Sequence, residues 1–157
     1  MDMTDSSTAP KARILIADDR PDNLHLLATR LANEGYAFIT AADGEEALKK
    51  LRSAVPDLVL LDIHMPKKDG FDVLQEMRAD PLIAHIPVIV VTATRIAPQD
   101  VRLGLGLGAD DYITKPFDWR ELAARVRAKL RVKYVEDVLR RRRELGLLPQ
   151  DLSARLT

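Results

Sequence analysis

Short runs of apolar residues alternate along the chain with longer stretches in which apolar residues recur at helical spacing. This alternation is typical of βαβ units, in which parallel strands form a sheet and the connecting helices cover both of its faces. We predict strands at residues 14–17, 36–40, 58–61, 88–91 and 112–114. The third run, Leu58–Leu61, is apolar without a break, as expected for a strand covered on both faces.

The stretches between the strands carry helix signals. Pro21 suits the first turn of a helix, where its missing N–H costs nothing. Asp43 and Glu46 have the spacing of a capping box at the start of the next helix. Further helices are predicted at 71–79, at 98–107, where glycines weaken the pattern, and from Trp119 onward. The pattern therefore predicts one domain of five βα units.

The helical pattern continues beyond Leu130 to about Gly146, farther than a five-unit sheet needs. We interpret residues 1–10 as a disordered leader, 11–131 as the folded domain, and 132–157 as a helical extension and tail. Arg131 and Arg142 interrupt the best heptad register, so a sustained coiled coil is not established. The extension is predicted to serve as a dimer contact or as the linker to an output module, although a stand-alone domain is the alternative.

The composition narrows the functional classes. Lys and Arg together number 24, as do Asp and Glu, so overall charge predicts no attraction to nucleic acid or to an anionic membrane. We interpret the run Arg140–Arg143 as a solvated helix face. The chain has no cysteine, which excludes disulfides and thiol catalysis and fits the cytoplasm. No apolar stretch approaches the roughly 20 residues of a membrane span.

Polar residues follow four of the predicted strands. Asp18 and Asp19 follow the first, Asp62 the third, Thr92 the fourth and Lys115 the fifth. Because ligands bind beyond the carboxyl ends of parallel strands, these side chains are expected to share one site. An isolated Asp-Asp pair is more simply explained as a solvated helix cap, but the third aspartate and the lysine favour a site. Clustered carboxylates need a cation, and hard oxygen ligands favour Mg²⁺.

A carboxylate beside Mg²⁺ and an ammonium group is equipped to attack phosphorus as a nucleophile. At this point the chain resembles a known family, the bacterial response-regulator receiver domains, which are the phosphoacceptors of two-component signalling. The resemblance covers about Arg13 to Leu130. It is carried by four segments in order: ILIADD at 14–19, LDIHMPKKDG at 61–70, VVTA at 90–93 and GADDYITKPF at 108–117.

The resemblance implies a flavodoxin-like sheet of order 2-1-3-4-5, with an extended C-terminal helix. It also implies that Asp62 accepts a phosphoryl group from a sensor histidine kinase or a phosphotransfer protein. Asp18, Asp19 and Asp62, with the backbone carbonyl of His64, are implied as ligands of Mg²⁺, with Mn²⁺ as a substitute. Lys115 is implied to pair with the phosphoryl oxygens, and Thr92 to move toward them.

Other implied features concern switching and assembly. Tyr112 matches the aromatic switch position, and the Lys115–Pro116 bond is the candidate for a cis peptide. The switching surface is implied to be the fourth helix, fifth strand and fifth helix, and a homodimer is expected through this surface or the C-terminal helix. The charged residues that fit such a dimer are Asp111, Glu121 and Arg125, but Val132 replaces an arginine common in the transcription-factor branch, which puts the symmetric dimer in doubt.

Two alternative functions stay open. An aspartyl-phosphate phosphatase also uses Mg²⁺ and an aspartate nucleophile, but those enzymes place a second aspartate two residues later, where this chain has His64. We interpret the His64 side chain as a solvent-facing loop residue. A degenerate interaction module without phosphorylation is disfavoured, because no site residue is missing. The sequence thus predicts a signalling domain without direct nucleic-acid or membrane binding.

Overall fold

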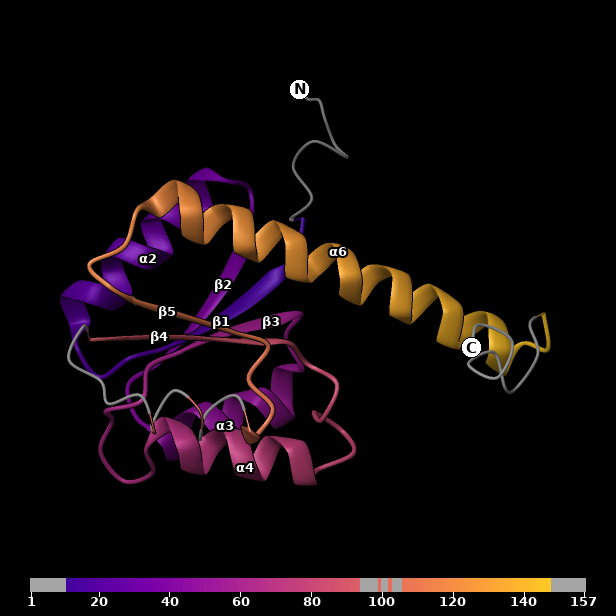
Figure 1. Ribbon diagram of the computed structural model, residues 1–157, viewed down its shortest axis with the longest axis horizontal. Helices are drawn as coiled ribbons and strands as arrows, with labels where there is room; N and C mark the ends of the chain where they lie inside the picture. Colours follow the sequence, from indigo (N-terminus) through magenta and orange to yellow (C-terminus); the bar gives the residue numbers. More distant parts are fainter. Residues whose placement is uncertain (1–10, 94–98, 100–101, 103–105, 148–157) are drawn as a thin grey trace.

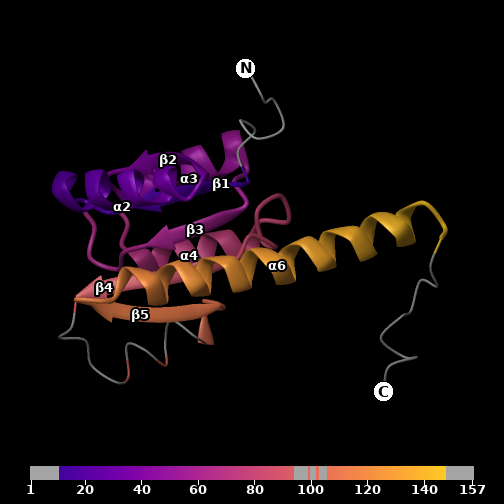
Figure 2. The ribbon, with the colours of Figure 1, turned by 90° about the horizontal axis from the view of Figure 1, so that it is seen from above.

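A five-stranded parallel sheet of order β2-β1-β3-β4-β5 forms the centre of the computed structural model, which describes residues 11–93, 99, 102 and 106–147. The predicted fold class and strand order are therefore confirmed. Helices α2 and α6 cover one face of the sheet, and α3 and α4 cover the other (Figures 1 and 2). The elements are β1 (Arg13–Ala17), α2 (Pro21–Asn33), β2 (Ala37–Ala41), α3 (Gly44–Ala54), β3 (Leu58–Leu61), α4 (Gly70–Ala79), β4 (Val88–Ala93), β5 (Asp111–Lys115) and α6 (Trp119–Glu144).

Alternation along the central strands builds two separate apolar layers. In β1, Leu15 contributes to the core under α3 and α4, whereas Ile14 and Ile16 contribute to the core under α2 and α6. Successive side chains of a strand point to opposite faces, so a strand covered twice must be apolar throughout. All four residues of β3 are at most 1% exposed, as the unbroken run Leu58–Leu61 predicts.

Two strand ends lie later in the chain than the apolar pattern predicts. Thr92 lies within β4, paired with Thr114, and Lys115 is the last residue of β5, paired with Ala93. The polar side chains of Thr92 and Lys115 do not end the ladder, because the backbone groups of β4 and β5 continue to pair. The second strand begins at Ala37 rather than Tyr36, whose side chain is nevertheless buried.

The helix caps agree only in part with the sequence. Asp43 caps α3 by accepting a hydrogen bond from the Glu46 N–H at 2.8 Å, but the Glu46 carboxylate accepts from the Ala42 N–H instead of that of Asp43. The reciprocal capping box expected there occurs at α4, where Asp69 and Asp72 each accept from the other's backbone N–H.

Helix α6 extends well past the sheet (Figures 1 and 2). It runs for 26 residues without interruption, as predicted from the pattern beyond Leu130. The ion pair from Lys133 to Asp57, at 3.9 Å, links the helix to the start of β3. The predicted helix at 98–107 lies largely outside the described residues; of its positions, 99, 102 and 106 are helical.

Arg78, near the end of α4, joins the loops that lead into β4 and β5. Its guanidinium donates to the carbonyl oxygens of Ala84 and Ile86 at 2.8 Å and to that of Gly108 at 2.6 and 3.0 Å. It also pairs with Asp110 at 3.0 Å, and the same carboxylate oxygen accepts from the Val88 N–H. One partly buried side chain thus fixes three segments of the chain.

Candidate phosphoacceptor site

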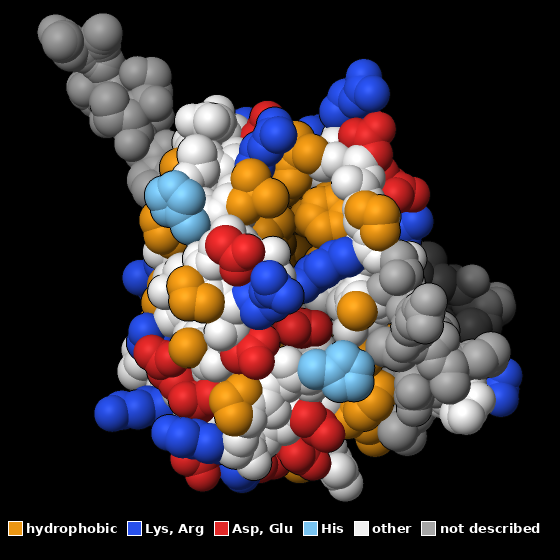
Figure 3. Space-filling view, turned by 90° about the vertical axis from the view of Figure 1, so that its left-hand side faces the viewer, with side chains coloured by type: hydrophobic (Ala, Val, Ile, Leu, Met, Phe, Trp, Pro, Cys, Tyr) orange, Lys and Arg blue, Asp and Glu red, His pale blue; other side chains and the backbone are white. Residues whose placement is uncertain are grey.

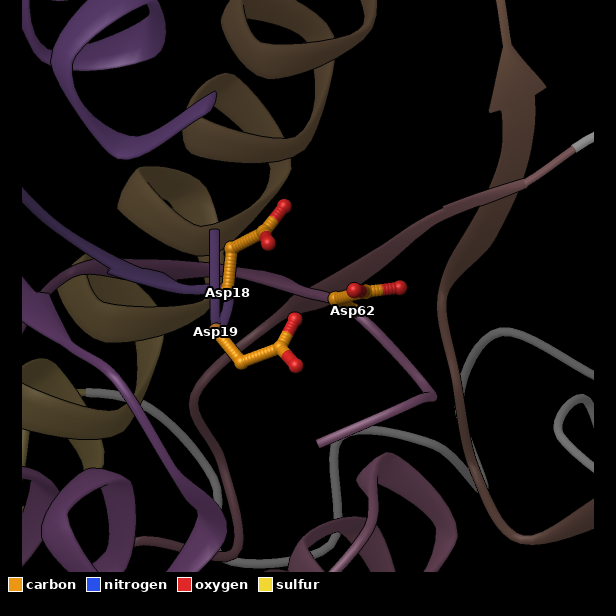
Figure 4. A group of neighbouring side chains, drawn as sticks. All are labelled: Asp18, Asp19 and Asp62. Carbon is orange, nitrogen blue, oxygen red and sulfur yellow. The ribbon is translucent and has the colours of Figure 1, made fainter. Parts of the chain in front are cut away.

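The ends of two neighbouring strands bring three carboxylates together. β1 ends immediately before Asp18 and Asp19, and β3 ends immediately before Asp62. β1 and β3 are paired, and the Asp62 N–H continues the ladder by donating to the Ala17 carbonyl at 2.9 Å. One carboxylate oxygen from each aspartate lies within 4.8 Å of the other two, and Figure 4 shows the three side chains around one space.

Burial differs among the three aspartates. Asp18 and Asp62 are buried, at 2% and 8% exposed, whereas Asp19 is exposed. Burying charged carboxylates together is costly unless cations compensate for them. Acidic side chains gather beside Lys and Arg side chains near the middle of the face that contains the carboxyl ends of the strands (Figure 3).

Lys115 provides one such positive charge. Its ammonium nitrogen Nζ lies 2.9 Å from Asp18 Oδ2 and is three-quarters buried. Asp18 also accepts hydrogen bonds from the Arg20 N–H at 2.9 Å and the Asn23 side-chain amide at 3.3 Å. Lys115 therefore lies in the cluster, but its ion pair is with Asp18 and not with Asp62.

The environment of Asp62 disfavours its ionised form. Burial, chiefly, raises the pKa of this carboxyl above its ordinary value, and the charge of Asp18 adds to the effect. Lys115, the Ile63 N–H and Thr92 act in the opposite direction without cancelling it. The Ile63 N–H donates to Oδ1 at 2.8 Å, so one carboxylate oxygen is held by the backbone and no hydrogen bond between described residues engages Oδ2.

Thr92 lies on β4, the strand next to β3. Its residue is 0% exposed, and its hydroxyl makes no hydrogen bond of ordinary geometry within the described part of the chain. The hydroxyl is still near enough to Asp62 to favour the carboxylate. Because buried polar groups normally have a partner, this hydroxyl is suited to an oxygen atom that arrives at Asp62.

The loop after β3 is held close to the acceptor. The Gly70 N–H donates to the Ile63 carbonyl at 2.7 Å. A Cβ at Gly70 would lie 2.5 Å from the Asp62 carbonyl oxygen and 2.7 Å from the Ile63 Cα, so only glycine fits. His64 is exposed and lines the cleft, and no hydrogen bond between described residues uses its carbonyl oxygen.

The remaining predicted site residues lie on or after β5. The peptide bond from Lys115 to Pro116 is cis, the isomer implied by the resemblance, and Pro116 lines the same cleft as Asp62. Tyr112 lies in the middle of the β5 region and packs, partly buried, against the core under α3 and α4.

Sequence reasoning did not identify Asn23 and Arg20, which complete the surroundings of Asp18 and also line the cleft. The available signal was their position: both fall at the start of the helix that follows the paired aspartates, where a backbone N–H and a short amide can reach back. Arg20 acts here through its backbone, so its side-chain type carries no signal.

The donor set fits a hard divalent cation. Three carboxylates supply oxygen ligands within reach of one centre, and the His64 carbonyl oxygen is available beside them. Oxygen-rich sites of this kind suit Mg²⁺ or Mn²⁺, and Cys ligands are absent from the chain.

Comparison with known proteins places this arrangement in a family. The model of the response regulator receiver domain matches residues 14–127. The alkaline phosphatase synthesis transcriptional regulatory protein PhoP of Bacillus subtilis is 48% identical over 119 residues, which cover 76% of this chain and 48% of that protein. The response regulator PleD of Caulobacter vibrioides is 44% identical over 135 residues, or 86% of this chain and 30% of PleD.

Solved structures agree. A CheY-like response regulator receiver domain protein from Methanospirillum hungatei superimposes with a TM-score of 0.74 at 32% identity, covering 79% of this chain and 97% of that one. The receiver domain of a Pseudomonas aeruginosa sensor histidine kinase, at TM-score 0.70 and 29% identity, covers 76% of this chain and 97% of that one, and has a magnesium ion coordinated in its active-site cleft.

The fold, the acidic cluster and these matches define a receiver domain of the two-component type. The chain belongs to the response regulator receiver family. It spans about half or less of the length of the curated relatives named above. Within the described residues, none of the helices has the length and hydropathy needed to cross a bilayer.

Proposed function

We propose that this domain is a cytoplasmic phosphoacceptor in which Asp62 receives a phosphoryl group from a histidine kinase or a phosphotransfer protein. The proposal depends on one observation: oxygen atoms of Asp18, Asp19 and Asp62 lie within 4.8 Å of one another, and Lys115 pairs with the first of them. A nucleophile, a cation site and a fixed ammonium group are then available together.

The proposed roles follow from the contacts of each group. Because the Ile63 N–H holds Oδ1 of Asp62, the second oxygen, Oδ2, attacks phosphorus while the bond from phosphorus to the donor breaks and the donor keeps that electron pair. Lys115 balances negative charge on the phosphoryl oxygens. The buried Thr92 hydroxyl donates to one of these oxygens, which satisfies its missing hydrogen bond.

Asp18, Asp19 and Asp62, with the carbonyl oxygen of His64, would hold Mg²⁺, or Mn²⁺ in its place. The bound cation supplies electrostatic stabilisation of the charge that develops on the transferring group. The related Pseudomonas receiver, with magnesium in its cleft, supports this assignment.

We further propose that phosphorylation switches a surface that includes β5 and the first turns of α6. Thr92 on β4 and Tyr112 on β5 are paired neighbours of the acceptor strand, with Tyr112 in register with Val90. A shift of the Thr92 hydroxyl toward Asp62 would leave space for the Tyr112 ring to turn inward. Residues 11–131 are proposed as the receiver, and the helix beyond as a connection to an output partner.

Incubation with radiolabelled acetyl phosphate and Mg²⁺ is expected to label the domain to at most one phosphoryl group per chain. The variant Asp62→Asn should reduce labelling by at least 100-fold, because an amide is not a nucleophile toward phosphorus. EDTA should have a similar effect on the wild type. Asp69→Asn, an exposed cap outside the cluster, is the matched control and should label normally. Release of phosphate in many turnovers would indicate a phosphatase, and wild-type chain that takes no label would contradict the proposal.

The raised pKa of Asp62 gives a separate prediction about stability. In EDTA at neutral pH, Asp62→Asn is expected to raise the free energy of unfolding by on the order of 1 kcal/mol, because it removes a buried charge beside Asp18. The folded state binds the Asp62 proton more tightly than the unfolded chain, so the wild type loses stability as pH rises through the raised pKa. The advantage of the variant should therefore shrink as pH falls toward 4. Urea unfolding at several pH values measures it, and a variant less stable than wild type at every pH would contradict it.

A further inference from the structure

The outer face of α6 carries an apolar stripe that the domain does not cover. Its members are spaced by four, three and four residues: Ala128, Val132, Val135 and Leu139. Val132 and Val135 are 56% and 50% exposed. At about 100° per residue, the stripe lies on the side of the helix away from Leu122 and Val126, which are buried against the sheet. A second helix can therefore approach without meeting the domain.

The charges beside the stripe distinguish possible partners. Arg131 and Glu136 flank it on opposite sides, are exposed, and make no hydrogen bond or ion pair with any described residue. Neighbouring charges differ in this respect, because Asp137 pairs with both Lys133 and Arg140 on the same helix. The two unpaired charges stand five positions apart, the separation of the g and following e′ positions that face each other in a parallel two-stranded coiled coil.

We propose that α6 binds α6 of a second copy of this chain as a short parallel coiled coil. Val132 and Leu139 occupy a positions, Ala128 and Val135 occupy d positions, and Arg131 of each copy pairs with Glu136 of the other. The two-fold axis forms this ion pair twice. In an antiparallel pair centred on the same stripe, Arg131 would instead face Arg140 of the second copy, which is repulsive.

The charges expected in the more usual interface support the α6 stripe as the contact. Arg125 already pairs within one chain with Asp111 at 2.6 Å and with Glu121 at 3.1 Å. Val132, where an arginine is common, lies in the stripe. Arg142 occupies the next core position and ends the seam, which is about 17 Å long at 1.5 Å per residue. We therefore expect weak association, with a dissociation constant on the order of 100 µM.

Sedimentation of the full chain without any phosphodonor tests the proposal independently of the phosphoacceptor role. The wild type should shift from monomer to dimer between about 10 and 1000 µM, a range that brackets the expected constant. Arg131→Glu and Glu136→Arg should each weaken dimerisation by about fivefold, and the double variant should return to within about twofold of wild type. Arg141→Glu, on the same helix but off the stripe, is the matched control and should have no effect.

Cross-linking tests the parallel register. The chain has no cysteine, so single-cysteine variants report one contact each. Val135→Cys should form a disulfide dimer under mild oxidation much faster than Arg141→Cys, since only the seam position meets its own copy. Val132→Cys with Leu139→Cys would cross-link efficiently only in the antiparallel arrangement. A wild-type monomer at all concentrations, single variants no weaker than wild type, or preferential 132–139 cross-links would each overturn the proposal.

Discussion

Replacing Arg78 by alanine is expected to lower the free energy of unfolding by about 3 kcal/mol. The substitution removes the donor for three backbone carbonyl groups and leaves the carboxylate of Asp110 without its guanidinium partner. Arg78→Lys should recover only part of the loss, because an ammonium group cannot match the fork of a guanidinium. Urea unfolding followed by circular dichroism measures both variants.

Arg52 provides the control for Arg78. It also ends in a guanidinium paired with a carboxylate, that of Asp80 at 2.9 Å, but its side chain is 44% exposed and the described contacts engage no backbone carbonyl. Exposed pairs of this kind contribute little, so Arg52→Ala should cost less than about 1 kcal/mol. If the two alanine variants lost equal stability, the buried carbonyl contacts of Arg78 would not be the cause.

Gly70→Ala is expected to reduce both stability, by about 3 kcal/mol, and labelling from acetyl phosphate, by at least tenfold. The new Cβ would lie 2.5 Å from the backbone oxygen of Asp62 and 2.7 Å from the Ile63 Cα, and neither atom belongs to a flexible side chain. The backbone must shift, which displaces the acceptor from Asp18 and Lys115. Denaturant unfolding and the initial rate of labelling are the two measurements.

Gly106→Ala is the matched control for this effect. Gly106 is helical, and no described atom lies within 4 Å of a Cβ built there. Alanine at a helical position is favoured over glycine by up to about 1 kcal/mol, so this variant should be as stable as the wild type or slightly more stable, with normal labelling. A Gly70→Ala protein that also labelled normally would show that the loop relaxes without moving Asp62.

The sequence was sufficient to predict the sheet because each central strand is short, apolar and followed by a recognisable helix start. Leu58–Leu61 is the clearest case, since four consecutive aliphatic residues suit a strand buried on both faces. Strand ends were harder to predict. Thr92 is polar yet lies inside β4, because ladder pairing depends on backbone groups that side-chain polarity does not report.

The site was predictable to the level of side-chain type but not of pairing. Asp18, Asp19 and Asp62 could be assigned to one edge from strand order, and they do meet there. That Lys115 bonds to Asp18 rather than Asp62 depends on side-chain length and on the Asn23 amide nearby, which only coordinates reveal. The contacts of Arg78 were also missed, because four of its five acceptors are backbone oxygen atoms, distributed over three residues.

The projection of α6 past the sheet means that this chain consists of two parts with different sources of order. The segment up to about Lys133 is fixed by tertiary packing, so it should melt together with the core. The turns beyond depend mainly on local helix formation, which is marginal over so few residues in water. These terminal turns can fray and reform while the sheet stays intact, so a binding event there changes the order of the helix without taxing the stability of the domain.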